Sequence, residues 1–383
     1  MDSTGEPLHV IFLPYMAPGH MIPMVDIARL FAAHGVHVTI ITTKMNALRF
    51  KATIDRDVAA ADRHITLEIL PFPSAEAGLP EGCENLADTP SHEMAMRLFH
   101  TIDLLQPRSK SSCVIAVPIA LSPIGKTTTT FLELFGRVKE AEKKSYGMVA
   151  NSFHALESAY ADYYRKAIGI KGWHVGPVSL FNKDEVDNAE RGDKATINRE
   201  SCFHWLDSKE PNSVLYVCFG SLSRFSKTQL TEMVHAFEDT SCSFIWVVPK
   251  VLKTNEAADP EWWLPEGFKE RMEESGKGLI LRGWAPQVLR IGVPVGNEDW
   301  KMSPTDETSL ISRDKIYKAV SQVMDGGNEA EGMRRVVKRL GELAMEAIED
   351  GGSSYNDLKT LMEDIKLYRQ KNRISSPSSG VTP

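Results

Sequence analysis

Residues 9–42 read HVIFLPYMAPGHMIPMVDIARLFAAHGVHVTIIT, and this stretch decides the fold class. His9–Pro14 is a short apolar run rich in β-branched and aromatic residues, which is typical of a buried parallel strand. Apolar residues recur at helical spacing from Met24 to Phe31, and Gly35 can end that helix because glycine accepts the left-handed cap conformation. Val36–Thr42 is a second strand. The resulting βαβ unit predicts an α/β protein with a doubly wound parallel sheet.

Similar patterns continue on both sides of a charged, apolar-poor stretch in the middle of the chain. Because that stretch cannot bury enough apolar surface to order itself, it predicts a linker at 181–204. The sequence therefore indicates an N-terminal domain over 1–180, a C-terminal domain over 205–370 and a disordered tail over 371–383. Further strands are expected at Ile65–Leu70, Gly147–Ser152, Val214–Gly220 (as a buried strand), Phe244–Val248 and Leu279–Leu281, and helices at Glu93–Leu105, Leu156–Ile168, Lys227–Phe237, Asp314–Asp325 and Ala330–Glu349.

The composition argues against several classes of protein. The 383 residues include 44 Lys and Arg against 51 Asp and Glu, so there is no electrostatic case for nucleic-acid binding. No apolar run of about 18 residues is present, and the polar N-terminus is not a secretory signal. Five scattered cysteines without a Cys-x-x-Cys motif indicate reduced thiols in a cytoplasmic protein rather than disulfides or a metal site.

Two nucleotide-binding motifs are weak in this sequence. Ile124–Thr127 resembles the end of a phosphate-binding P-loop, but Ala120 stands where that motif needs glycine, so a surface loop is favoured. No Gly-x-Gly-x-x-Gly follows the first strand, although a dinucleotide site needs those glycines for close approach of the pyrophosphate. A nicotinamide oxidoreductase therefore remains only a remote alternative.

Three places carry side chains suited to chemistry at the carboxyl edge of a parallel sheet. His20 follows the first strand, where a neutral imidazole can accept a proton; alternatively it only bonds the backbone at a helix start. Gly220 and Ser221 close a later strand, and they either offer N–H and O–H groups to a phosphate or form an ordinary turn. Trp284 could stack on a planar base, and Gln287 could hydrogen-bond a sugar or a base.

Taken together, these motifs agree in order and spacing with one family. PxxxPGHxxPM at 14–24, VLYVCFGS at 214–221 and GWAPQ at 283–287 resemble plant UDP-sugar-dependent glycosyltransferases of small molecules. The resemblance covers 8–105, 131–287 and 291 to about 367. Details such as NSFHALESAYADYY and WLDSKEPNSVLYVCFGSL are similar to legume enzymes that glycosylate triterpenoid saponin aglycones or flavonoids.

The resemblance implies a GT-B fold, in which two Rossmann-like domains face a cleft. The N-terminal domain would bind a small apolar hydroxylated acceptor, although no acceptor-binding residue is identified, and the C-terminal domain would bind the UDP-sugar. His20 would be the general base of an inverting transfer, in which the acceptor oxygen attacks the anomeric carbon and UDP leaves. The donor contacts implied are the diphosphate for Gly220 and Ser221, the uracil for Trp284 and Ala285, and the ribose for Gln287. No cofactor is expected, because the UDP-sugar is a co-substrate. The resemblance also implies that no metal is needed, and a monomer is expected.

The chain departs from the family in two places. After GWAPQ the family's signature continues with residues that hold the diphosphate, ribose and sugar, whereas here Arg290 runs directly into Ile291. The second departure falls at about 106–130, where Val117 stands in place of the aspartate that orients the family's histidine; a valine cannot accept the imidazole N–H. We therefore expect a C-terminal domain truncated after 287, lacking central strands beside Val214–Gly220, and destabilised. The alternative function is a catalytically inactive form that retains only acceptor binding.

Overall fold

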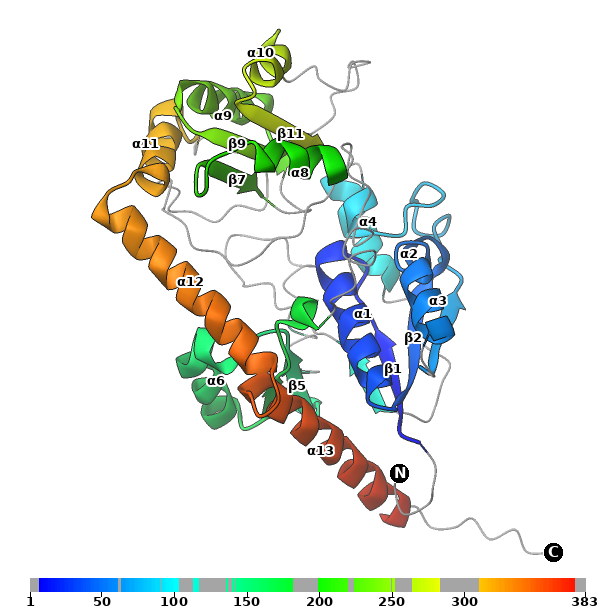
Figure 1. The fold of residues 1–383 in the computed structure, drawn as a ribbon. Helices are drawn as coiled ribbons and strands as arrows, with labels where there is room; N and C mark the ends of the chain where they lie inside the picture. Colours follow the sequence, from blue (N-terminus) through cyan, green and yellow to red (C-terminus); the bar gives the residue numbers. More distant parts are fainter. Residues whose placement is uncertain are drawn as a thin grey trace, which may run out of the picture.

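The structure is a computed structural model that describes residues 7–60, 63–89, 91–102, 113–116, 136, 140, 142–181, 199–219, 224–248, 250–251, 264–282 and 310–375. Parallel strands alternate with helices in both halves of the chain, and long C-terminal helices run between the halves (Figure 1). The predicted α/β class with parallel sheets is therefore confirmed.

The first sheet contains the βαβ unit that opens the sequence. Its strand order is β3-β2-β1-β4, every neighbouring pair is parallel, and α1 connects β1 to β2. Gly35 follows α1 with a φ of 77°, as expected of a residue that ends a helix in the left-handed region. The strands are β1 His9–Leu13, β2 His37–Thr43, β3 Ile65–Leu70 and β4 Cys113–Ala116, and the helices are α1 Pro18–Ala33, α2 Lys44–Ala47, α3 Lys51–Ala60 and α4 His92–Ile102.

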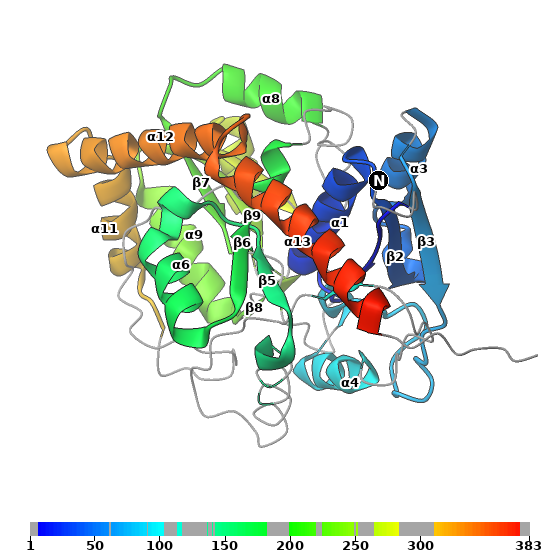
Figure 2. The same ribbon diagram turned by 90° about the horizontal axis from the view of Figure 1, so that it is seen from below.

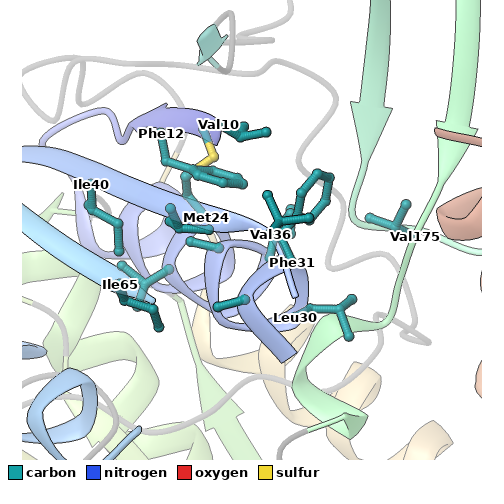
Figure 3. Close-up of a cluster of buried hydrophobic side chains, with 14 of the residues drawn as sticks. Val10, Phe12, Met24, Leu30, Phe31, Val36, Ile40, Ile65 and Val175 are labelled. Carbon is teal, nitrogen blue, oxygen red and sulfur yellow. The ribbon is translucent and has the colours of Figure 1, made fainter. Parts of the chain in front are cut away.

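A continuous apolar core joins α1 to this sheet. Val10 and Phe12 of β1, Phe31 of α1 and Ile40 of β2 are fully buried in it (Figure 3). The rings of Phe12 and Phe31 meet edge to face, with centroids 5.5 Å apart. Burying a side chain of this size contributes about 1.5–3 kcal/mol, so the core fixes α1 rigidly on the sheet and with it the loop that precedes α1.

A second parallel pair extends the N-terminal half. The strands β5 Gly147–Ala150 and β6 Lys171–His174 are joined by α6 His154–Ile168, which ends at Gly169 with a φ of 72°. The sequence predicted β5 and α6, but it did not predict β6. Trp173 and, just after the strand, Val175 belong to the same core as α1, so this pair packs with the first sheet.

The C-terminal half has a three-stranded parallel sheet of order β11-β9-β7. The central strand β9 is almost wholly buried, whereas β7 is only half-buried and Tyr216 in it is 44% exposed. The expectation of a buried strand at Val214–Gly220 is corrected accordingly, because in the described sheet β7 is an edge strand. The elements are β7 Val214–Cys218, β9 Ser243–Val248 and β11 Gly278–Arg282, the short pair β8 Arg224–Phe225 and β10 Lys250–Val251, and the helices α8 Arg199–Asp207, α9 Lys227–Asp239, α10 Phe268–Glu274 and α11 Arg313–Met324.

The last two helices return the chain to the N-terminal half. α12 Asn328–Ile348 runs from α11 to α6, and α13 Ser353–Ser375 continues along β6 (Figures 1 and 2). Leu358, Leu361, Met362 and Ile365 of α13 are buried in the core that contains α1. Part of 205–370 therefore packs with the N-terminal core, and α8 begins at Arg199, inside the stretch expected as a linker, while the expected domain boundaries stay predictions.

A buried ion-pair network also holds α1 in place. Asp57 of α3 accepts hydrogen bonds from Arg29 of α1 and from Arg63, and Arg29 and Asp57 are 8% and 7% exposed. Removing Asp57 takes the bidentate partner away from buried Arg29 and leaves it the longer contact with Asp26, at 3.9 Å. We therefore expect Asp57→Ala to lower the free energy of unfolding by about 3–5 kcal/mol, measured by urea denaturation.

A matched control lies one half-turn away on the same helix. Asp55 pairs with Lys51 at the surface, where the two side chains are 60% and 55% exposed. Solvent screens such a pair, so Asp55→Ala should cost about 0–1 kcal/mol. Equal urea midpoints for the two variants would contradict this account of how α1 is held.

Candidate functional site

α1 begins at Pro18, six residues before the Met24 at which the sequence indicated helical spacing, so His20 lies on the first turn of α1 rather than before the helix. β1 ends at Leu13, Ala17 is the N-cap residue, and the backbone N–H of His20 donates to the Ala17 carbonyl at 2.9 Å. In the parallel register Leu13 pairs with Ala116, so β4 ends at the same edge of the sheet. His20 therefore stands at the carboxyl edge of the sheet, where α/β proteins hold their ligands.

The environment of His20 favours the neutral imidazole. Burial lowers the pKa of His20 below its ordinary value of 6.5. The positive end of the α1 dipole also opposes protonation at this position. At neutral pH the ring is uncharged, and it can accept a proton from a hydroxyl group.

Apolar side chains gather beside the turn that leads into α1 and His20. Ala17 belongs to a cluster with buried residues of the 79–86 segment and of α4, and half-buried aromatic and methionine side chains pack against it. The backbone N–H of Leu86 donates to the Met16 carbonyl at 2.8 Å, which holds the 79–86 segment against the turn before α1 and His20. The cluster contains Ala17, Leu79, Cys83, Leu86 and Leu98, with Tyr15, Phe72, Ala77, Met94, Ala95 and Met96 around it.

A buried polar network next to this cluster was missed by the sequence analysis. The amide of Asn46, just after β2, donates to the Thr43 hydroxyl and to the Glu84 carbonyl at 2.8 Å each. Asn85 donates to Asn46 at 2.8 Å, and all three side chains of Thr43, Asn46 and Asn85 are fully buried. The network fixes the 79–86 segment against the end of β2. Residues about 40 positions apart in the sequence give no local signal for such a pairing.

The residues predicted to bind the donor lie outside the described part of the structure, as does Val117. They are Gly220, Ser221, Trp284, Ala285 and Gln287. The strands that lead to them are described: β7 ends at Cys218 and β11 at Arg282, on either side of β9. The two parallel strands end at the same edge of one sheet, which is the arrangement that would bring the predicted residues together; their roles remain predictions.

No helix in the described part of the chain is both long and apolar enough to cross a membrane. No group of three or more His, Cys, Asp or Glu side chains among the described residues is arranged to hold a metal ion. The absence of a metal and the cytoplasmic location remain predictions.

Comparisons with known proteins found close relatives, although no family model matches the chain. Scopoletin glucosyltransferase of Nicotiana tabacum is 35% identical, with 94% of this chain and 98% of that protein covered. UDP-glucose flavonoid 3-O-glucosyltransferase 7 of Fragaria ananassa is also 35% identical, with 95% and 97% covered. The crystal structure of UGT73P12 of Glycyrrhiza uralensis, complexed with glycyrrhetinic acid 3-O-monoglucuronide, matches with a TM-score of 0.82 at 30% identity, covering 96% of this chain and 98% of that one.

The same comparison shows how much shorter this chain is than its relatives. The alignment with the tobacco protein runs over 485 positions, 102 more than the 383 residues available. Because the alignment spans nearly the whole of both proteins, the shortfall lies inside the chain rather than at its ends. Sequence identity, coverage and fold agree: the chain belongs to the plant UDP-glycosyltransferases and has their GT-B fold.

Proposed function

We propose that this chain carries out an inverting transfer of glucose from UDP-glucose to a hydroxyl group of a small plant metabolite, with His20 as the general base. The imidazole takes the hydroxyl proton, the acceptor oxygen forms a bond to the anomeric carbon, and the bond to UDP breaks with its electron pair on the departing phosphate. The observation that supports this most is the half-buried His20 with a lowered pKa at the carboxyl edge of the first sheet. The reaction needs no cofactor besides the UDP-sugar co-substrate.

The acceptor we propose is a flavonoid or a triterpenoid. The apolar cluster around Tyr15, Phe72 and Met94 adjoins the turn before α1 and His20, and it suits a hydrophobic aglycone better than a polar one. Some of the relatives fit this class, since their names include flavonoid and anthocyanin glucosyltransferases, and the Glycyrrhiza structure holds a triterpenoid glucuronide.

The donor would occupy the C-terminal sheet edge at which β7 and β11 end. We assign Gly220 and Ser221 to the diphosphate, Trp284 and Ala285 to the uracil, and Gln287 to the ribose. A relative at 25% identity, UGT89C1 of Arabidopsis thaliana, has been crystallised with UDP-L-rhamnose, and its TM-score is 0.69. We propose a slow reaction, because positioning the two substrates supplies much of a transferase's rate and this chain has lost more than 100 aligned positions.

A second candidate function follows from that shortfall: a monomeric acceptor-binding protein without turnover. One experiment separates the two. The purified chain is incubated with UDP-glucose and with flavonoid and triterpenoid acceptors, and products are identified by mass spectrometry and by the NMR coupling of the anomeric proton. A β-glucoside supports the transferase, since UDP-glucose is α-linked. Saturable acceptor binding without product supports the binding protein. The absence of both product and acceptor binding would contradict both functions.

A further inference from the structure

Tyr15 and His20 meet across the tight turn that precedes α1. Their rings are perpendicular, with an interplanar angle of 90° and centroids 5.6 Å apart. The turn itself brings them together, because the Ala17 N–H donates to the Tyr15 carbonyl at 2.8 Å and the His20 N–H donates to the Ala17 carbonyl at 2.9 Å. A perpendicular arrangement is one of the two favoured geometries of an aromatic pair.

A histidine base normally needs a partner that fixes its ring orientation. Within the described residues no hydrogen bond or ion pair reaches the His20 imidazole, and the ring of Tyr15 is the one aromatic contact it has there. The sequence places Val117 where the family has an orienting aspartate, and a valine side chain offers no acceptor. Among the described residues, the ring of Tyr15 is therefore the contact that can orient the imidazole.

We propose that Tyr15 is the positioning residue of His20: its ring orients the imidazole and excludes water from one side of it. This inference rests on the proposed function, in which His20 is the base. Tyr15 is itself held in the apolar cluster with Phe72 and Met94, so its ring has a fixed orientation from which to act. Burial raises the pKa of Tyr15 far above its ordinary value, so the phenol stays protonated and acts through its ring rather than as a second base.

The test follows the imidazole directly by NMR titration of the full chain. Of the 11 histidines, the His20 signal is the one missing from His20→Ala. In Tyr15→Leu, water reaches the ring, so the pKa of His20 should rise toward 6.5. Tyr15→Phe keeps the ring and should leave the pKa unchanged. If Tyr15→Leu does not fold, Tyr15→Met supplies the measurement, because methionine fills irregular space.

Phe72→Leu is the matched control. Phe72 is a half-buried aromatic residue of the same cluster, and no ring contact joins it to His20 in the described structure. This variant should leave the pKa of His20 where it is in the unaltered chain. An unchanged pKa in Tyr15→Leu or Tyr15→Met, or an equal rise in Phe72→Leu, would overturn the inference.

These outcomes are separable from a failure of the proposed function. The titration requires no turnover, so it tests Tyr15 even if the chain forms no product. Product formation by His20→Ala at the rate of the unaltered chain would contradict the role of His20 as base, whatever the titration shows. A pKa of His20 that is insensitive to Tyr15, together with loss of product in His20→Ala, would contradict the role of Tyr15 alone.

Discussion

Glucosyl transfer by this chain should rise by a factor of about 10³ or more when the donor-binding segment of a relative is inserted between Arg290 and Ile291. The segment would come from the tobacco scopoletin glucosyltransferase, as the residues between its counterparts of these two positions. The resemblance implies that this segment supplies several hydrogen-bond donors to the diphosphate, and each donor lost from a group that builds up charge costs on the order of 10²–10³ in rate. The measurement is kcat/KM with UDP-glucose and a flavonoid acceptor.

The same insertion should stabilise the C-terminal sheet. The described sheet ends at β7, and Tyr216 on this strand is 44% exposed while β9 is almost wholly buried. Pairing the free edge of a sheet satisfies backbone groups and covers apolar side chains. A Gly/Ser insert of equal length is the control, and it should raise neither the rate nor the melting temperature. An equal gain from that insert, or no gain from a folded chimera, would contradict the assignment of the missing segment to donor binding.

The chain with the inserted donor-binding segment is called the repaired chain. Replacing His20 with alanine in it should lower kcat/KM by about 10²–10⁴-fold, the range over which a positioned general base accelerates proton transfer. His34→Ala is the matched control, because the imidazole of this exposed histidine at the other end of α1 bonds the Leu30 carbonyl and lies at the opposite edge of the sheet from His20. It should leave kcat/KM unchanged. Equal activity of the two variants would remove His20 from the mechanism.

The pH dependence of the repaired chain provides a check on the same residue. Burial lowers the pKa of His20 below 6.5, so the imidazole remains neutral, and competent as a base, to a lower pH than an ordinary histidine. The acid limb of kcat/KM should therefore lie below pH 6.5 and should disappear in His20→Ala. An acid limb above that value would mean that another group, or a charged His20, controls the rate.

The parts of the fold that the sequence predicted are those with a strong local period. β3 was predicted with its observed bounds, Ile65–Leu70, and β1 and β2 were within a residue or two, whereas α1 begins six residues before the Met24 at which its periodicity was recognised. Gly35 marked the end of α1 because the backbone there needs a positive φ that other residues seldom adopt. These features depend on neighbours in the sequence, which is why periodicity and turn residues suffice to find them.

The parts that the sequence did not predict depend on which distant segments meet. β6 is only four residues long, KGWH, and has no clear alternation, and α13 has a weakly amphipathic sequence whose buried face is defined by packing on β6. Nothing local to Leu358 or Leu361 indicates that they enter the core of a segment about 300 residues earlier. Tertiary contacts of this kind override local preference.

The residues of the candidate site also differ in whether a local sequence pattern could predict them. His20 was predicted because a residue that follows the first strand of a βαβ unit lies at the carboxyl edge of the parallel sheet, where ligands bind. Tyr15 was not singled out, because its contact with His20 depends on the tight turn at Ala17 that only the structure reveals. The two strands that lead to the predicted donor residues lie in one sheet, and the meeting of those residues stays a prediction.

We propose that the N-terminal half of this chain still binds an acceptor, although it departs from the family at about 106–130, while its donor-binding half is reduced. Calorimetric titration of the purified full chain with a triterpenoid or flavonoid aglycone, and separately with UDP-glucose, tests it most directly. The account predicts saturable binding of the aglycone that is altered in Tyr15→Leu, and binding of UDP-glucose at least 100-fold weaker than to the tobacco relative, since each 1.4 kcal/mol of lost contact is about tenfold in affinity. UDP-glucose binding as tight as that of the relative, with no binding of any aglycone, would contradict it.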